Sequence, residues 1–404
     1  MYVHVPFCVS ICPYCDFVVV AGTAARGPRS SIERYLAAVE RELELRADAL
    51  DERFGTARPP LDSLYLGGGT PSLLPPDAIA RLIEVVRRRF GLDRGAEVTL
   101  EANPGPDERG DAAALRAAGV TRLSFGAQSM DDAELRSLGR RHRARDVGDA
   151  VAAARVAGIG SVSLDLLYDV PGQSQESWAR TLEAALALEP EHLSAYALTL
   201  DDPAAEGLTG PSGDHLPPAE GARRWRDRAR SGQDDERAAE MYELAVARLG
   251  TAGYRGYEIS NWALPGHESR HNLAYWRRLP FEAVGPGAHA FDGAVRRWNA
   301  APLAGYLAAL APVPPAAPTA PAALPAVPPG GEDRVSDATA AAEATILALR
   351  LDTGVPQAEA ASGLLGPHLA WALGAGLLGP IAGDRLALTT RGRLLSNELF
   401  ARLV

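Results

Sequence analysis

The sequence has few cysteines, no excess of positive charge and no long apolar run. All three of its cysteines lie between residues 8 and 15 of a 404-residue chain. An odd number of cysteines in one short segment excludes a disulfide framework, so we expect a reducing, cytoplasmic compartment. There are 51 acidic residues against 41 basic ones, a net charge of −10, which argues against a nucleic acid partner. The start of the chain lacks the pattern of a signal peptide, and no run reaches the roughly 18 apolar residues of a membrane helix.

Short apolar segments alternate with amphipathic stretches over the first half of the chain. The segments expected to be strands are Tyr2–Pro6, Leu61–Leu66, Val98–Glu101, Arg122–Phe125, Ser161–Leu166 and His192–Leu198. Helical spacing is clear after Pro76, where apolar residues recur every three or four positions. Such alternation predicts an α/β fold with a parallel sheet, and six units predict a partial (β/α)6 barrel. Polar segments that follow the strands should meet at one mouth of this barrel.

Changes in composition divide the chain into four parts. Residues 1–200 form the predicted barrel, and residues 201–310 begin with a polar excursion before a helix near Asp234. Residues 311–334 are rich in Pro and Ala, which predicts a linker. Residues 335–404 predict a smaller α+β module like a winged helix. Its expected elements are a helix over Ser336–Leu349, a hairpin over Leu378–Leu388 and a last helix over Thr389–Phe400.

The cysteines have the spacing C-x3-C-x2-C, at Cys8, Cys12 and Cys15. Thiolates are soft ligands that select zinc or iron–sulfur centres. Structural zinc usually takes four ligands in two separated pairs, and the chain has no second pair. Three thiolates on a four-iron cube would leave one iron open to another ligand. An iron–sulfur site is therefore favoured, and a zinc-stabilised adaptor is kept as an alternative.

The segments YVHVPFC and CPYCDF resemble the radical SAM superfamily, in its oxygen-independent coproporphyrinogen III oxidase-like branch. Within that branch the sequence is most similar to the HemW haem chaperones. The resemblance covers most of residues 1–310 and extends more loosely to the C-terminal module. It implies a partial (β/α)6 radical SAM barrel in which the three cysteines hold a [4Fe–4S] cluster and the fourth iron binds S-adenosylmethionine (SAM).

The resemblance also implies a set of SAM-binding residues, most of them just after predicted strands. They are Tyr2, Tyr14, Gly68, Gly69, Thr70, Glu101, Gln128, Arg140 and Asp165. SAM carries an ammonium, a carboxylate, a sulfonium and ribose hydroxyls, so acidic, basic and amide partners are all required. Consecutive glycines in GGGTPS would allow backbone N–H groups to approach a ligand. Asp169 and Val170 depart from the family pattern GLPGQ and would add a carboxylate near the mouth.

Two features separate haem carriage from porphyrin oxidation within this branch. The dehydrogenases usually have a fourth cysteine two residues after the third, and here that position is Phe17. The segment HNLAYW matches the HNxxYW motif associated with haem binding in HemW proteins. The resemblance thus implies haem ligation by His271, with Asn272 orienting the ring and Tyr275 and Trp276 stacking on the macrocycle; His289 is a second candidate ligand. His215, His267 and His368 have no evident partner in the sequence.

Taken together, these patterns predict a haem chaperone that binds haem, a [4Fe–4S] cluster and SAM and delivers haem to an acceptor haemoprotein. Peripheral membrane contact through the acceptor and a homodimer are both compatible with this hypothesis. The alternative is a radical SAM oxidoreductase acting on a tetrapyrrole such as coproporphyrinogen III, although Phe17 argues against that activity. Whether the chain is an enzyme stays open at this point, and no catalytic residue is assigned.

Overall fold

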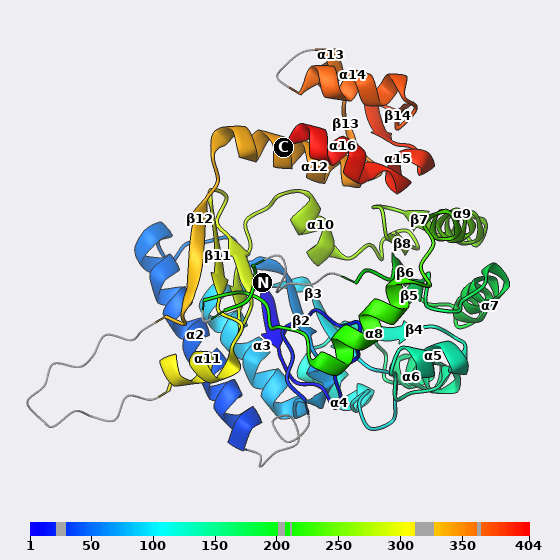
Figure 1. The fold of residues 1–404 in the computed structure, drawn as a ribbon. Helices are drawn as coiled ribbons and strands as arrows, with labels where there is room; N and C mark the ends of the chain where they lie inside the picture. Colours follow the sequence, from blue (N-terminus) through cyan, green and yellow to red (C-terminus); the bar gives the residue numbers. More distant parts are fainter. Residues whose placement is uncertain (22–29, 201–206, 211, 312–326, 362–364) are drawn as a thin grey trace, which may run out of the picture.

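The computed structural model describes all residues except 22–29, 201–206, 211, 312–326 and 362–364. Over the described residues, its largest sheet has nine strands in the order β7-β8-β6-β5-β4-β3-β2-β1-β9 (Figure 1). Six of them are parallel neighbours in chain order: β1 (Tyr2–Val5), β2 (Leu61–Gly68), β3 (Leu92–Ala102), β4 (Arg122–Gln128), β5 (Ser161–Tyr168) and β6 (His192–Ala197). All six predicted strands are confirmed.

The six parallel strands do not close on themselves. β9 (Ala283–Val284) pairs in parallel with the outer side of β1. β8 (Asn261–Ala263) pairs antiparallel with β6, and β7 (Arg255–Gly256) with β8. The two ends of the parallel sheet are therefore occupied by other strands, and the result is an open, partial barrel of the predicted class.

Helices connect the parallel strands and pack against the sheet (Figure 1). They are α2 (Ser30–Phe54), α3 (Pro76–Phe90), α4 (Ala112–Ala118), α5 (Asp132–Ser137), α6 (Ala144–Val156) and α7 (Gln175–Leu186), with a short 3-10 turn η1 (Pro71–Leu73) after β2. On α3 the buried residues include Ile79, Leu82, Ile83 and Val86, the positions with helical spacing in the sequence. Apolar periodicity thus sets which helix faces are buried.

The segment predicted as a polar excursion contains a strongly polar helix, α8 (Glu220–Arg230), which the sequence analysis did not single out. Residues 201–206 and 211 of the same segment lie outside the described residues. The helix α9 (Asp235–Thr251) begins where it was expected: the Asp234 side chain accepts a hydrogen bond of 2.9 Å from the N–H of Arg237. A carboxylate at that position satisfies a free N–H of the first turn.

Residues 270–334 add a helix, α10 (Arg270–Trp276), and a small antiparallel sheet beside the barrel. The sheet contains β10 (His289–Phe291), β11 (Val295–Asn299) and β12 (Gly330–Arg334), and α11 (Leu303–Ala309) follows β11. β12 lies within the segment predicted as a linker, yet it pairs with β11 over five residues. The linker prediction is therefore wrong for residues 330–334, and residues 312–326 lie outside the described part.

The C-terminal residues form a module with its own hydrophobic core, at the top of Figure 1. Its elements are α12 (Asp337–Arg350), β13 (Val355–Pro356), α13 (Gln357–Ala361), α14 (Gly366–Gly374), β14 (Leu378–Ile381), β15 (Arg385–Leu388), α15 (Thr390–Leu394) and α16 (Ser396–Leu403). The predicted first helix and hairpin are present. The predicted last helix is divided in two at Leu395.

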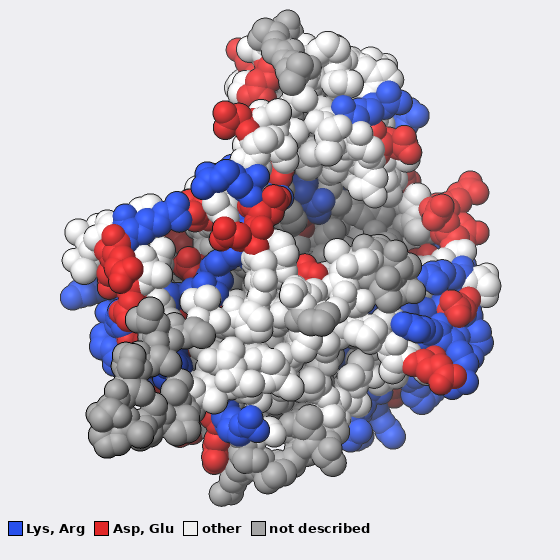
Figure 2. Space-filling model, turned by 60° about the vertical axis from the view of Figure 1, so that its left-hand side comes forward, with Lys and Arg blue, Asp and Glu red and all other residues white. Residues whose placement is uncertain are grey.

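Charged side chains of both signs are interspersed around the periphery of the molecule in Figure 2. The centre of this face is largely uncharged and is hollowed beneath the C-terminal module, with acidic and basic side chains bordering the hollow. None of the helices in the described ranges combines the length and the apolar character that crossing a membrane requires.

Candidate functional site

The three cysteines lie in the loop after β1 and line a cavity of about 430 Å³. The same cavity is lined by residues at the carboxyl ends of β2, β3, β4 and β5, as expected for a barrel of parallel strands. Besides the three cysteines, nine of the predicted ligand residues line this cavity. Among the predicted SAM residues they are Tyr14, Gly68, Gly69, Thr70, Glu101, Gln128, Arg140 and Asp165, and Asn272 joins them from the haem motif.

The thiol groups in this cavity have polar neighbours. The Thr70 hydroxyl donates to Cys8 Sγ at 3.6 Å, and Arg140 Nη1 donates to Cys12 Sγ at 3.5 Å. Burial raises the pKa of Cys8 to about 11 and that of Cys15 to about 12. In the part of the chain that the structure describes, no three His, Cys, Asp or Glu side chains converge as the ligands of one metal ion do. Three soft donors around a shared space, with a cation and a hydroxyl beside them, fit an iron–sulfur cluster.

The backbone of the cysteine loop is anchored by Arg226 of α8. Its Nε donates to the carbonyl of Pro13 at 3.0 Å, and its Nη2 donates to the carbonyl of Cys15 at 2.8 Å. The Arg226 residue is only 3% exposed, although the helix around it is strongly polar. Sequence reasoning missed this residue because an arginine in an Arg-rich segment gives no signal of burial.

The glycine-rich turn after β2 packs against the cysteine loop. The N–H groups of Gly69 and Thr70 donate to the carbonyls of Val5 and Phe7, at 2.8 and 2.7 Å. A Cβ atom on Gly69 would lie 2.7 Å from the Phe7 oxygen. The glycines thus permit close approach of the chain's own backbone, whereas the sequence analysis expected these N–H groups to approach a ligand.

Two partly buried carboxyl groups, on β3 and β5, line the cavity. Glu101 accepts hydrogen bonds from the Tyr65 hydroxyl at 2.7 Å and from the N–H of Gly68 at 2.9 Å. Burial raises the pKa of Glu101 to about 7. Asp165 accepts from the hydroxyls of Ser124 and Ser194, and burial raises its pKa as well. Acceptors held in place by fixed donors suit the ammonium and ribose hydroxyls of SAM.

Donors in the same cavity suit an anionic group. Arg140 Nη2 donates to the Gly126 carbonyl at 2.8 Å and to Asn103 Oδ1, while the buried Nε of Arg140 has no hydrogen-bond partner among the described residues. Gln128 lies beside it with a φ of 65°, a left-handed conformation that residues other than glycine rarely adopt. Strained backbone of this kind is concentrated at ligand sites. Asn103 was not predicted as a site residue, although it belongs to the segment EANPG that follows β3.

Two sequence-based expectations do not fit this cavity. Tyr2 lies outside it: the Tyr2 hydroxyl is 3.0 Å from His4 Nδ1, and the ring lines a second cavity. Asp169 adds no free carboxylate at the mouth, because it is buried and paired with Arg237, whose Nε donates to Asp169 Oδ1 at 3.0 Å.

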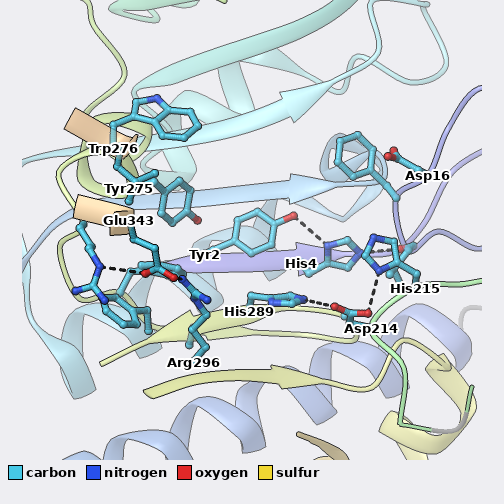
Figure 3. A pocket seen from close by; sticks show the side chains of 18 residues that line it. Tyr2, His4, Asp16, Asp214, His215, Tyr275, Trp276, His289, Arg296 and Glu343 are labelled. Atoms are coloured by element: carbon cyan, nitrogen blue, oxygen red, sulfur yellow. Dashed lines mark hydrogen bonds and ion pairs between the residues drawn. The ribbon is translucent and has the colours of Figure 1, made fainter. Parts of the chain in front are cut away.

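A second cavity, of about 570 Å³, is shown in Figure 3 and shares lining residues with the first. Its wall is rich in aromatic rings: Tyr2, Phe17, Tyr275, Trp276, Phe281 and Phe291. Three imidazoles, those of His4, His215 and His289, also line it. Asp16 and Phe17 belong to the walls of both cavities. The segment directly after Cys15 therefore separates the thiol cavity from the aromatic one.

The histidine of the HNLAYW segment is not free to bind a metal in this structure. His271 is 2% exposed, with Nδ1 3.1 Å from the Ser63 hydroxyl and Nε2 2.8 Å from the Tyr275 hydroxyl. Its ring stacks on Tyr65, and burial lowers its pKa well below the ordinary value. Both nitrogens are occupied, so the expectation that His271 is the axial haem ligand is not supported; the residue connects α10 to β2.

Comparison with known proteins agrees with the architecture. The model of the radical SAM superfamily matches residues 2–185. The heme chaperone HemW of Mycobacterium tuberculosis (strain H37Rv) is 37% identical over 404 residues, which cover 100% of this chain and 94% of that protein. The chain belongs to the HemW family of the radical SAM superfamily. The HemW of Bacillus subtilis is 33% identical over 312 residues, covering 77% of this chain and 75% of that protein.

Among solved structures, the coproporphyrinogen III oxidase HemN of Escherichia coli has a TM-score of 0.77 and 22% sequence identity, and the match covers 100% of this chain and 89% of that one. This likeness concerns the fold. In this HemW family member the haem-motif residues are distributed over three environments. Asn272 faces the thiol cavity, His271 is buried in the core, and Tyr275 and Trp276 line the aromatic cavity together with His289.

Proposed function

We propose that this chain is a cytoplasmic haem chaperone that binds haem in the aromatic cavity and passes it to an acceptor haemoprotein. In this proposal Cys8, Cys12 and Cys15 hold a [4Fe–4S] cluster, and SAM binds beside it in the thiol cavity. The observation that carries the proposal is the pair of adjoining cavities, one with three thiols and one with aromatic and imidazole groups, which share Asp16 and Phe17. The names of the HemW relatives support the same function.

The residues of the thiol cavity support a cluster and SAM. When bound, the cluster supplies an open iron site at which SAM is held. Arg140 offers a cation and an N–H without a partner among the described residues to a carboxylate, while Glu101 and Asp165 offer acceptors in the same cavity.

The aromatic cavity supports haem as the cargo. A volume of about 570 Å³ falls within the range of about 300–1,000 Å³ typical of cofactor sites. Six aromatic rings offer a flat macrocycle apolar and stacking contacts. Imidazoles can ligate iron, and arginines at the other end of the cavity can pair with propionates (Figure 3).

The chief competing function is oxidation of a porphyrinogen by SAM chemistry. Phe17 is 61% exposed, lines both cavities and offers no thiol where a fourth cysteine would be placed. We therefore rank haem carriage first. Coproporphyrinogen turnover measured with SAM and a reductant would reverse this ranking if product formed.

The test begins with anaerobic reconstitution of the cluster, followed by counts of iron, acid-labile sulfide and haem on one preparation. Haem is then titrated into the wild type and into Leu347→Trp, since Leu347 of α12 lines the aromatic cavity and a larger ring would fill it. The matched control is Ala344→Trp, an exposed position on the same helix. Transfer is measured by adding a haem-free acceptor and following its haem-bound spectrum.

We expect iron and sulfide in equal amounts, one haem per chain in the wild type and in Ala344→Trp, and weakened haem binding in Leu347→Trp. Zinc without sulfide would favour the adaptor hypothesis instead. If the reconstituted wild type fails to bind haem, the proposed function is contradicted. If both tryptophan variants bind haem equally well, the proposed cavity is contradicted.

A further inference from the structure

The histidines around the aromatic cavity differ in which ring nitrogens are already used. Both ring nitrogens of His4 have hydrogen-bond partners: Nδ1 lies 3.0 Å from the Tyr2 hydroxyl and Nε2 lies 2.7 Å from the Val18 carbonyl. His271, beneath the wall, is also occupied at both. His215 and His289 each have one nitrogen engaged, so among the described residues they are the imidazoles of this cavity that keep a nitrogen for a ligand.

A single carboxylate holds both of these rings. Asp214 Oδ1 lies 2.9 Å from His215 Nδ1, and Asp214 Oδ2 lies 2.9 Å from His289 Nε2 (Figure 3). The free nitrogens are therefore Nε2 on His215 and Nδ1 on His289. Metal-bound histidines commonly donate Nδ1–H to a carboxylate and ligate through Nε2. His215 has this arrangement, and His289 has the reverse one.

The segment that carries His215 is fixed to the small sheet. The Trp298 indole N–H donates to the Ser212 carbonyl at 3.1 Å, and the N–H of Ala301 donates to the Gly213 carbonyl at 2.8 Å. His289 is stacked on Trp298, with ring centroids 6.2 Å apart. The ligand position is thus held in advance by contacts that do not involve the ligand, as a binding site requires.

A cluster of charges at the other end of the cavity fits the acidic edge of a porphyrin. Arg278 Nε pairs with Glu343 of α12 at 3.3 Å, and Arg296 pairs with the other oxygen of the same carboxylate. Arg278 Nη2 is buried and has no hydrogen-bond partner in the described ranges. Glu343 thus occupies the position that a propionate carboxylate would take between two guanidinium groups.

We propose that His215 is the axial ligand of the haem iron, oriented by Asp214, and that Arg278 and Arg296 bind the propionates in exchange for Glu343. This assignment rests on the proposed haem chaperone function and replaces His271, which the sequence motif favoured. His289 acts through Asp214 and is a positioning residue. Haem entry would then release the two arginines from α12, the first helix of the C-terminal module.

The test is a titration of ferric haem into the cluster-loaded full chain, with absorbance and electron paramagnetic resonance spectra recorded for each variant. His215→Ala should weaken binding by at least about 100-fold and remove the signature of imidazole ligation, because loss of groups that only orient a ligand already costs about 10- to 100-fold. Added imidazole should restore that signature. Asp214→Asn should lose about 10- to 100-fold with a shifted spectrum, and His289→Ala should keep imidazole ligation with a shifted spectrum.

His368→Ala, in the C-terminal module, is the matched control and should bind like the wild type. If the wild type binds haem while His215→Ala keeps the same spectrum and affinity, the ligand assignment is overturned and the proposed function survives. If the wild type binds no haem, the proposed function itself fails. If His271→Gln loses imidazole ligation while His215→Ala keeps it, His271 of the HNLAYW segment is the axial ligand instead.

The propionate sites have an independent test, in which one substitution should raise haem affinity and another should lower it. Glu343→Gln removes the competing carboxylate, so haem affinity should rise by about tenfold, whereas Arg296→Ala should lower it. A contact that only held α12 in place would give weaker binding in both variants. That outcome would overturn the propionate assignment.

Discussion

Replacing Arg226 with alanine should release the cysteine loop and weaken its hold on a cluster. The guanidinium makes hydrogen bonds of 3.0 and 2.8 Å to the carbonyls of Pro13 and Cys15. Hydrogen bonds from charged donors contribute about 1.5–3 kcal/mol each. Because the loop is partly exposed, water can replace part of this hydrogen bonding in the variant. We therefore take the lower end of the range for each bond, which gives about 3 kcal/mol for the two bonds. The variant loop must be ordered when the cluster binds, so cluster affinity should fall by about 100-fold.

The assay follows loss of the cluster's visible absorbance in anaerobic protein challenged with an iron chelator. Arg226→Lys keeps the charge but cannot reach both carbonyls with a planar fork, so its loss rate should be intermediate. Arg228→Ala is the matched control, because Arg228 lies on the same helix and is exposed. An Arg226→Ala variant that melts at the wild-type temperature and loses its cluster to the chelator no faster than the wild type does would refute the reasoning.

Three further predictions concern the thiol cavity. Burial raises the pKa of Glu101 from 4.5 to about 7. The folded state therefore keeps a proton that the unfolded state releases, and the free energy of unfolding should fall by about 3 kcal/mol as pH rises from 4.5 to 7. Urea unfolding should show this fall as a pH-dependent difference in the free energy of unfolding between wild type and Glu101→Gln. A difference that does not change with pH would contradict the burial argument. Gly69→Ala places a Cβ atom 2.7 Å from the Phe7 oxygen and should cost about 1–3 kcal/mol of stability by thermal melting, whereas Gly95→Ala, with nothing within 4 Å, should cost little. Burial raises the pKa of Cys8 to about 11 and of Cys15 to about 12, so cluster binding must displace at least the protons of these two thiols. Cluster affinity at fixed free iron should therefore drop by at least about 100-fold per pH unit lowered, and a pH-independent affinity would exclude protonated thiols.

The barrel and the thiol cavity could be predicted from the sequence because each depends on local patterns. Apolar runs located the strands, and the rule that parallel strands present their carboxyl ends together placed Thr70, Glu101 and Asp165 near the cysteines. The environment of His271 could not be predicted. Its ring contacts Ser63, which is 208 residues away in the chain, and a motif does not show which face of a helix the fold will bury.

The same limit explains the missed polar residues. Arg226 and Arg228 look alike in an Arg-rich segment, yet α8 buries the first and exposes the second. His215 has its partner beside it, at Asp214, but neighbouring Asp and His residues are common, and only the fold brings His289 to the other oxygen of that carboxylate. Long-range pairings of single side chains carry no periodic signal, so they emerge only from the folded structure.

Phe17 shows how the two cavities depend on one another. It is the second residue after Cys15, and its ring is 61% exposed although it is large and apolar. A ligand in the aromatic cavity would cover part of this ring, because Phe17 lines that cavity. Since Asp16 and Phe17 belong to both walls, any change in the backbone that positions Cys15 also moves a wall of the aromatic cavity. By linkage, a cluster that favours one position of this segment must alter haem affinity by the same factor by which haem alters cluster affinity. A cysteine at residue 17 would give this wall a fourth thiol, whereas phenylalanine gives it a surface suited to a macrocycle.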